Sequence, residues 1–377
     1  SRRSFQNNSD DKASLQLLQK ISMSHYHIAS IPGDGIGQEV IPAGIQVAEV
    51  LAQRFGFSIA FKHFDWSCQT YLNTGTMMPK EGLEQLQSFD AIFLGAVGWP
   101  SVPDHVSLWG LLIPIRRHFD QYVNIRPVRL LKGIESPLAG RGPEDIDFVI
   151  VRENCEGEYS ESGGRMYAGT EQEIVLQESI FTRHGTDRIL RYAFDLAKKR
   201  AGRLTSATKS NGIIHSMPFW DERVKAISSE HPDVEVNQFH IDILTAHFVL
   251  HPDWFDVVVG SNLFGDILSD LGPAIAGSIG IAPSANINPQ GTYPSMFEPV
   301  HGSAPDIAGQ GIANPIATIW TLAMMLEHLG ESEAAQACEE AMEAVLTAGP
   351  KSRTKDLGGT ATTASCTKAV IQTLMAS

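Results

Sequence analysis

The sequence predicts an α/β protein of two domains, and three observations lead to this prediction. Short apolar runs rich in β-branched residues, such as 255–260, suit buried strands of a parallel sheet. Segments with apolar residues at helical spacing separate these runs, so strands alternate with helices throughout, as is typical of α/β proteins. The length of 377 residues exceeds what one hydrophobic core usually organises, which favours two domains.

Composition excludes several classes of function. The chain has 29 Lys and Arg against 43 Asp and Glu, a net charge of −14, and no basic stripe, which argues against binding to nucleic acid or to an anionic membrane surface. No run approaches the roughly 18 apolar residues that a membrane span requires. The four cysteines lack metal-site spacing and indicate reduced thiols, as in a cytoplasmic protein. Residues 1–24 are expected to form a polar tail with a short helix at 13–21. Arg2-Arg3 is not expected to begin an export signal, because no apolar core follows it.

The first regular unit is a strand, a glycine-rich turn and a helix, at 26–31, 32–37 and 39–55. Such a unit suggests dinucleotide binding. The glycine spacing is G-x-G-x-G, however, rather than G-x-G-x-x-G, and no acidic residue closes a second strand in the usual place. The unit is therefore a poor Rossmann fingerprint.

The middle of the chain continues the alternation. Pro127 disfavours helix at Arg126, which makes 122–129 extended, and Pro114 is expected to interrupt a helix over 108–119. The elements expected as far as residue 152 are strands at 57–64, 90–97, 122–129 and 146–152, a short helix at 79–88, a proline-rich loop at 98–105 and the interrupted helix at 108–119.

Residues 160–181 are polar at first and then alternate, which predicts a projecting hairpin. A weakly buried two-stranded hairpin is marginal alone, so this one is expected to pair with a second subunit. The elements expected after it are helices at 187–200, 219–230 and 242–249, strands at 203–208 and 255–260, an extended segment at 234–239, a turn at 283–289, and two closing helices at 315–329 and 331–348.

The acidic stretch 261–270, directly after the apolar run 255–260, is the centre of the functional argument. Asp266 and Asp270 are four residues apart and share one face of a helix. Two such carboxylates repel unless a cation or an arginine lies between them, and oxygen ligands suit Mg²⁺ or Mn²⁺. The alternative interpretation is a helix N-terminus whose acids favour the helix dipole.

Several motifs together resemble one enzyme family. They are P-G-D-G-I-G at 32–37, N-I-R-P at 124–127, V-R-E at 151–153, N-L-F-G-D-I-L-S-D at 262–270 and E-P-V-H-G-S-A-P-D-I-A-G at 298–309. Their order and spacing resemble the metal-dependent β-decarboxylating dehydrogenases, which include isopropylmalate, isocitrate, homoisocitrate and tartrate/D-malate dehydrogenases. The resemblance extends from about residue 26 to the C-terminus.

The resemblance implies a fold and an assembly. The fold is two α/β domains that share a mixed sheet and is not a Rossmann fold. One domain comprises 25–121 with 280–377, and the other comprises 122–279, with an intersubunit clasp near 160–181. The assembly implied is a homodimer with shared active sites.

Residue roles follow from the same resemblance. Asp242, Asp266 and Asp270 match the metal ligands, with Asp242 supplied by the neighbouring subunit. Arg116, Arg126 and Arg152 match the arginines that bind substrate carboxylates. Lys209, also from the partner, matches the base, and Tyr159 matches the residue that protonates the enol after decarboxylation. The nucleotide loop is matched by His301, Gly302, Ser303, Ala304, Asp306 and Asn314.

A few residues indicate which cofactor and which substrate the protein uses. Asp306 accepts hydrogen bonds from a ribose but repels a 2′-phosphate, so the expected cofactors are NAD and Mn²⁺ or Mg²⁺, with K⁺ as an additional candidate. Isocitrate dehydrogenases have Ser and Asn at the positions where this chain has Gly110 and Leu112. Isopropylmalate dehydrogenases have Glu where this chain has Trp109. Trp109 and Leu112 are therefore expected to face the substrate. The bulky indole is expected to crowd the space of an isopropyl group, so D-malate or tartrate is preferred. The alternative substrate is 3-isopropylmalate. The alternative function is that of a non-catalytic regulatory subunit of an isocitrate-dehydrogenase-like complex.

Overall fold

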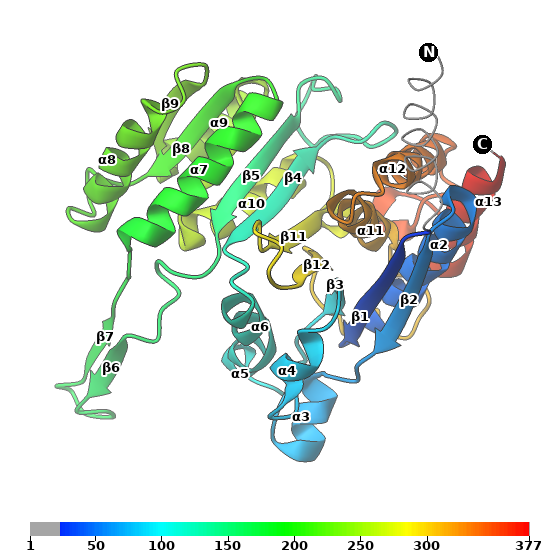
Figure 1. The fold of residues 1–377 in the computed structure, drawn as a ribbon, viewed down its shortest axis with the longest axis horizontal. Coiled ribbons are helices and arrows are strands. Elements are labelled where there is room, and N and C mark those ends of the chain that lie inside the picture. Colours follow the sequence, from blue (N-terminus) through cyan, green and yellow to red (C-terminus); the bar gives the residue numbers. More distant parts are fainter. Residues whose placement is uncertain (1–22, 377) are drawn as a thin grey trace, which may run out of the picture.

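The protein, described here by a computed structural model of residues 23–376, is built on one ten-stranded sheet (Figure 1). The expected helix at 13–21 lies outside the described residues, as does all but the end of the expected tail at 1–24. Across the sheet the strands are β2 (Ser58–His63), β1 (His25–Gly33), β3 (Ala91–Ala96), β12 (Ser295–Pro299), β11 (Pro283–Ile287), β4 (Val123–Arg129), β5 (Asp147–Glu153), β10 (Val257–Gly260), β8 (Arg203–Thr208) and β9 (Glu235–His240).

The sheet consists of two parallel halves joined through its middle. Strands β2, β1, β3 and β12 pair in parallel, as do β5, β10, β8 and β9. Between these halves β11 is antiparallel to both β12 and β4, and β4 is antiparallel to β5. The prediction of an α/β fold with a mixed sheet is confirmed.

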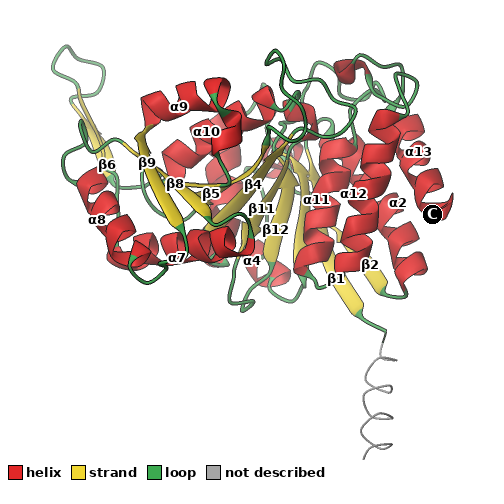
Figure 2. Ribbon diagram, turned by 90° about the horizontal axis from the view of Figure 1, so that it is seen from above, coloured by secondary structure: helices red, strands yellow, loops and turns green. Residues whose placement is uncertain are grey.

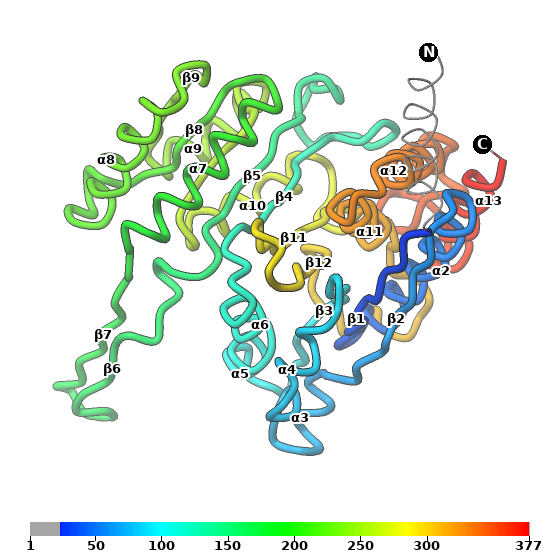
Figure 3. Tube along the Cα trace, viewed as in Figure 1, coloured from blue at the N-terminus to red at the C-terminus, as the bar shows by residue number. Residues whose placement is uncertain are grey.

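Helices cover both faces of this sheet (Figure 2). On the β5–β9 half, α7 (Arg183–Lys199) and α8 (Ser216–Ser228) lie on one face, and α9 (Ile241–Leu250) and α10 (Asn262–Ile275) on the other. The C-terminal helices α11 (Ile316–His328), α12 (Ser332–Thr347) and α13 (Thr363–Ala376) pack against α2 (Gly37–Phe55), which lies near the start of the chain (Figure 3). The largest buried apolar cluster extends through both halves of the sheet.

Several expectations about secondary structure were wrong. Residues 283–289 were expected to turn, but 283–287 form the buried strand β11, in which Asn286 is completely buried and donates to the Met296 carbonyl. The two expected closing helices are followed by a third, α13, which packs against α2. The short helix α3 (Cys68–Thr74) was also not anticipated. Its signals were local, a Ser67 cap and a left-handed Gly75 at its end.

The helix over 108–119 is not interrupted at Pro114. It begins as α5 (Asp104–Ser107), continues as a π-helical turn η1 (Leu108–Leu112), and ends as α6 (Ile113–His118). The Ile113 N–H bonds to the Leu108 carbonyl, five residues back. Pro114 has no N–H to donate to Gly110, and the wider turn accommodates this loss without breaking the helix.

The predicted hairpin is present and projects from the body of the protein (Figure 1). It consists of β6 (Gly163–Met166) and β7 (Ile174–Gln177), and every residue of both strands is exposed. The remaining elements are α4 (Gly82–Leu86), η2 (Pro252–Trp254), η3 (Ile279–Ile281) and η4 (Lys355–Leu357). Within residues 23–376 no helix combines the length and apolar character needed to cross a bilayer.

Candidate active site

A pocket of about 220 Å³ lies at the middle of the sheet, where antiparallel strands join the two parallel halves. One wall is apolar and the opposite wall is charged. The apolar wall includes Val97, Leu108, Leu112, Ile113 and Val300. The charged wall includes Arg116, Arg117, Arg126, Arg152, Asp266 and Glu298. The predicted arginines therefore converge on one cavity, although they come from three separate elements.

The three predicted arginines are all buried. Arg116, Arg126 and Arg152 are 7%, 8% and 3% exposed. Burial lowers the pKa of Arg126 and of Arg152, and the charge of Arg126 lowers the pKa of Arg152 further. Arg116 binds Glu298 at 2.7 Å, but its Nε atom is buried without a partner among the described residues. Buried cations that repel one another favour an anionic ligand.

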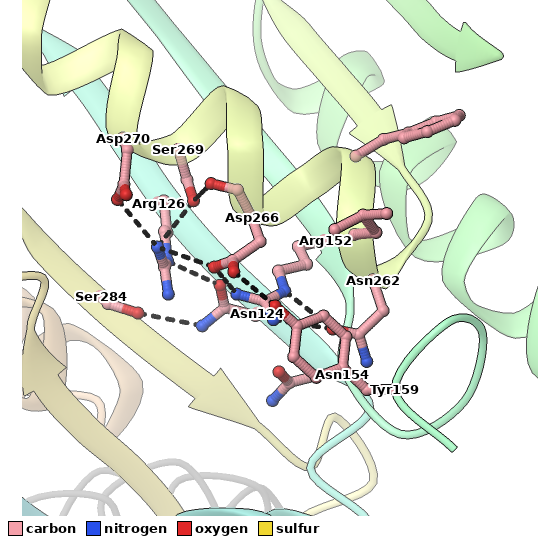
Figure 4. Close-up of polar contacts among 12 residues, drawn as sticks. Asn124, Arg126, Arg152, Asn154, Tyr159, Asn262, Asp266, Ser269, Asp270 and Ser284 are labelled. Atoms are coloured by element: carbon pink, nitrogen blue, oxygen red, sulfur yellow. Dashed lines mark hydrogen bonds and ion pairs between the residues drawn. The ribbon is translucent and has the colours of Figure 1, made fainter. Parts of the chain in front are cut away.

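Neutral side chains orient two of these guanidinium groups (Figure 4). Arg126 donates from Nε to Asn124 Oδ1 at 2.9 Å and from Nη1 to Ser269 Oγ at 2.6 Å. Arg152 donates from Nε and Nη2 to Asn262 Oδ1, at 3.1 and 2.7 Å. Amide and hydroxyl partners fix orientation without neutralising the positive charge. Glu298 and Asp266 offset part of the positive charge, but the three arginines outnumber these two carboxylates and leave positive charge for a ligand.

Asp266 lies at the centre of the charged wall. Arg152 Nη1 contacts its Oδ1 atom, and the Tyr159 hydroxyl donates to its Oδ2 atom at 2.7 Å (Figure 4). Burial raises the pKa of Asp266, but Arg152 and Arg126 outweigh burial, so that the pKa lies below its usual value. Burial raises the pKa of Tyr159, and the hydrogen bond to Asp266 raises it further. Tyr159 is thus held protonated beside a carboxylate.

Asp266 and Asp270 share one face of α10, as predicted. Arg126 Nη1 lies 3.8 Å from Asp266 Oδ1 and 3.9 Å from Asp270 Oδ1. The pKa of Asp270 is raised by burial, with Arg126 opposing and Asp266 adding to the increase. Between residues 23 and 376 no group of three or more His, Cys, Asp or Glu side chains is arranged to hold a metal. The oxygen ligands of the two carboxylates suit a hard divalent cation, although Arg126 lies near both in this structure.

Lys209 and Asp242 are brought together with each other, but neither lines the pocket. Lys209 follows β8, Asp242 begins α9, and Lys209 Nζ lies 2.7 Å from Asp242 Oδ1. The hydrogen bond from Lys209 lowers the pKa of Asp242. Nearby Ile214 and Ile243 are exposed to 70% and 45%. The pair thus lies on a surface with unusual apolar exposure.

The loop after β12 carries the predicted nucleotide residues. His301 and Gly302 line the pocket, and Ser303 and Gly302 line a neighbouring hollow with Trp99. Burial lowers the pKa of His301, so its ring is neutral. The Ser303 carbonyl accepts from the Ile36 N–H at 2.8 Å. The glycine-rich turn thus supports this loop, and a Cβ on Gly35 would lie 2.0 Å from the same carbonyl.

The remaining nucleotide residues extend away from the pocket. Ala304 adopts a positive φ of 42°, and Asp306 is exposed. Asn314 is buried and donates to Asp356 Oδ2 at 2.9 Å. Its amide is thus engaged within the protein.

The two predicted specificity residues differ in position. Leu112 lines the pocket, whereas Trp109 does not. The Trp109 ring instead faces Arg117, whose Cζ atom lies 4.9 Å from the ring centroid. The expectation that the indole faces the substrate is not supported by this geometry.

Sequence reasoning missed several polar residues of the site, notably Asn124, Asn154, Asn262, Ser269 and Glu298. A same-face rule could have found two of them. Asn124 is two residues from Arg126 on a strand, and Asn262 is four residues from Asp266 on a helix. Glu298 was part of a recognised motif, but its pairing with Arg116 is a long-range contact that no local pattern indicates.

The protein was compared with known families, proteins and structures. The sequence profile described as isocitrate/isopropylmalate dehydrogenase matches residues 27–373. The D-malate dehydrogenase (decarboxylating) of Escherichia coli strain K12 is 58% identical over 94% of this chain and 99% of its own. The tartrate dehydrogenase/decarboxylase of Pseudomonas putida is 59% identical over 93% and 98%. The crystal structure of isocitrate dehydrogenase from Methylococcus capsulatus has a TM-score of 0.82 at 33% identity, covering 93% and 99%.

Fold, site and similarity together define a decarboxylating dehydrogenase, and the chain belongs to the isocitrate/isopropylmalate dehydrogenase family. Within that family the relatives reported above at more than half identity are named for D-malate and tartrate. The expectations of an oxidoreductase and of a tartrate/D-malate dehydrogenase type are thus confirmed.

Proposed function

We propose that the protein catalyses the NAD-dependent oxidative decarboxylation of a small 2-hydroxy dicarboxylate, D-malate or tartrate, with Mn²⁺ or Mg²⁺. The observation that carries this proposal is the convergence of three buried arginines beside the Tyr159–Asp266 hydrogen bond. A chain of net charge −14 concentrates positive charge here, as an anionic substrate requires. The proposal includes a homodimer in which each site is completed by the partner.

The arginines would bind and orient the substrate. A planar guanidinium binds a carboxylate through two parallel hydrogen bonds, and Arg116, Arg126 and Arg152 are restrained by the rest of the site. Because these donors are fixed before the substrate arrives, little reorganisation accompanies binding.

Two groups would move protons. The partner subunit's Lys209 would take the proton of the 2-hydroxyl as hydride leaves C2. Loss of CO₂ from the carboxylate β to the new ketone leaves an enolate, and Tyr159 would donate its phenolic proton to C3, which gives the ketone product and a tyrosinate. Asp266 accepts from that hydroxyl and so keeps the tyrosine oriented.

Asp266, Asp270 and the partner subunit's Asp242 would hold the divalent cation, and the loop 301–306 with Asn314 would bind NAD. When bound, the cation supplies Lewis acidity at the 2-oxygen and NAD⁺ accepts the hydride. Potassium is an additional candidate ion, but none of the described contacts assigns it a site.

The surface of a single chain supports a dimer. Lys209 and Asp242, the proposed base and third metal ligand, do not line the pocket of their own chain. Exposed apolar side chains occur on α10 at Leu263 and Ile267 and on the hairpin at Val175. Apolar surface of this kind marks an interface. The hairpin would act as the intersubunit clasp.

The candidate substrates differ in size: D-malate and tartrate are small, whereas 3-isopropylmalate carries an isopropyl group. Isocitrate is disfavoured because Leu112, which lines the pocket, offers no hydrogen bond to a third carboxylate. The apolar wall at Leu108 and Leu112 favours 3-isopropylmalate as the second candidate. A regulatory subunit is disfavoured because every matched catalytic position is retained.

The test is NADH formation with purified protein and Mn²⁺ on D-malate, meso-tartrate, L-tartrate, 3-isopropylmalate and isocitrate. We expect the highest kcat/KM on D-malate or a tartrate, and loss of activity with a chelator. A clear preference for 3-isopropylmalate would select the second candidate. No NADH with any substrate would support the regulatory alternative.

A further inference from the structure

Arg117 joins two parts of the active site that are distant in sequence. From α6 its Nη2 atom donates to the Tyr159 carbonyl at 2.7 Å, and its Nη1 atom lies 3.2 Å from Glu161 Oε2. On the other side of the guanidinium, the Trp109 ring centroid lies 4.9 Å from Cζ. One arginine therefore contacts both an indole beside the pocket wall and the backbone of the residue that carries the phenol.

The π-helical turn brings Trp109 and Arg117 together. In a regular α-helix two residues eight positions apart would point about 80° away from each other, because 3.6 residues make one turn. A π-helical turn bonds i to i+5 and so absorbs roughly one extra residue. The separation then corresponds to seven residues, just under two turns, and both side chains lie on one face.

The Tyr159 carbonyl has few anchors. Among the described residues Arg117 is its one hydrogen-bond donor. The preceding residue is held separately, since the Glu158 carboxylate accepts from Ser261 Oγ at 2.7 Å and from the Leu263 N–H at 3.0 Å. Glu161 has a side-chain exposure of 76%, so its ion pair with Arg117 contributes little. The following residue is held by the hairpin, since the Ser160 carbonyl accepts from Gln177 Nε2 at 3.0 Å. The bond from Arg117 is the contact that ties the Tyr159 backbone to α6.

We propose that Trp109 and Arg117 are a positioning pair for Tyr159. Trp109 supports the guanidinium through its ring face, and Arg117 fixes the Tyr159 backbone so that the hydroxyl meets Asp266. This inference rests on the proposed role of Tyr159 as proton donor. It assigns Trp109 a role through Arg117, in place of a direct role in excluding large substrates.

The pair affects turnover more than substrate binding. Proton delivery to carbon depends steeply on geometry, and a shift of about 1 Å costs on the order of a hundredfold. We therefore expect Arg117→Ala to lower kcat at least about tenfold with KM for D-malate within about twofold. A cation–π contact at a partly exposed site is weak, so Trp109→Leu should lower kcat about threefold. Trp109→Phe, which keeps an aromatic face, should lose less.

Hydrogen–deuterium exchange of the protein without substrate gives a measurement that does not depend on activity. Amides of 154–161 should exchange faster in Arg117→Ala, and less markedly so in Trp109→Leu. Arg141 provides the matched control, because it also donates to a carbonyl, that of Leu250 at 2.8 Å, and to a carboxylate, Asp253 Oδ1 at 3.1 Å, away from the pocket. Arg141→Ala should leave exchange of 154–161 and kcat unchanged.

Four results would overturn the inference. Unchanged exchange of 154–161 in Arg117→Ala would remove the positioning role, as would faster exchange without loss of kcat. A rise in KM as the main effect of Arg117→Ala would instead indicate direct substrate contact. A gain in 3-isopropylmalate over D-malate in Trp109→Leu would restore the crowding role of the indole. If wild-type protein fails on all substrates, the proposed function fails, while the exchange data still test the contact.

Discussion

Lys209 and Asp242 form an ion pair of 2.7 Å with each other and lie away from the pocket that holds Tyr159 and Asp266. The division of the proposed catalytic set between two surfaces of one chain predicts shared sites. Lys209→Ala and Asp266→Asn should each be inactive as pure proteins. Mixed dimers should regain up to about half of the activity per dimer, because one of the two sites then carries neither defect.

The measurement is NADH formation after the two variants are mixed and subunit exchange is verified by mass spectrometry. A mixture of Lys209→Ala with Asp242→Asn is the control, since both defects lie on the same surface and each site of the mixed dimer would carry one of them. Recovery in the control, or none in the test mixture, would contradict shared sites.

The acidic pair on α10 predicts the cation requirement. Asp266→Asn removes a carboxylate that faces Arg152 and Tyr159, and Asp270→Asn removes one that is 69% exposed at the side chain. Each should weaken Mn²⁺ binding at least about tenfold, measured by titration calorimetry, with thermal unfolding near that of the wild type. Asp253→Asn, an acid outside the pocket, should bind Mn²⁺ normally. Wild-type affinity in both α10 variants would refute the assignment.

Asp306 predicts the choice of dinucleotide. Its exposed carboxylate repels a 2′-phosphate, and Ile307 beside it offers no compensating group. The double change Asp306→Lys with Ile307→Tyr should raise the ratio of kcat/KM for NADP over NAD by at least about tenfold. Gln310→Lys adds one positive charge to the same loop and should change the ratio less. An unchanged ratio in the double variant would place the ribose elsewhere.

Glu153 predicts a pH dependence of stability. Burial raises its pKa to about 8, although the N–H groups of Glu156 and Cys155 oppose the increase. The folded state therefore retains a proton that the unfolded state releases near pH 4.5, so this group makes stability fall as pH rises from about 4.5 to 8. Glu153→Gln should flatten the melting temperature over this range. An equal slope in Glu153→Gln and wild type would show that Glu153 is ionised throughout.

Local patterns predicted much of the fold, and their failures have physical causes. The apolar run 255–260 and the amphipathic segment 187–200 were recognisable because burial of one face imposes a period. Strand β11 was not, since Ser284 and Asn286 are polar, and both accept hydrogen bonds from Asn124, which is far away in sequence.

Some residues of the site could likewise be predicted from the sequence, and others could not. Arg116, Arg126 and Arg152 were predicted, and the structure brings them to one pocket. The position of Trp109 was not predicted, because it depends on one extra residue in a π-helical turn. That Lys209 and Asp242 serve the pocket of a partner subunit is a prediction, because a single chain places them away from its own pocket.

The strand order has a consequence for synthesis of the chain. Strands β11 and β12 lie between β3 and β4, although β3 and β4 are made much earlier. During translation the inner edges of β3 and β4 therefore emerge with no partner strand until residues 283–299 follow. Unpaired edges invite pairing with other chains. Nascent chains that stall before residue 283 should consequently depend on chaperones more than chains released after residue 299.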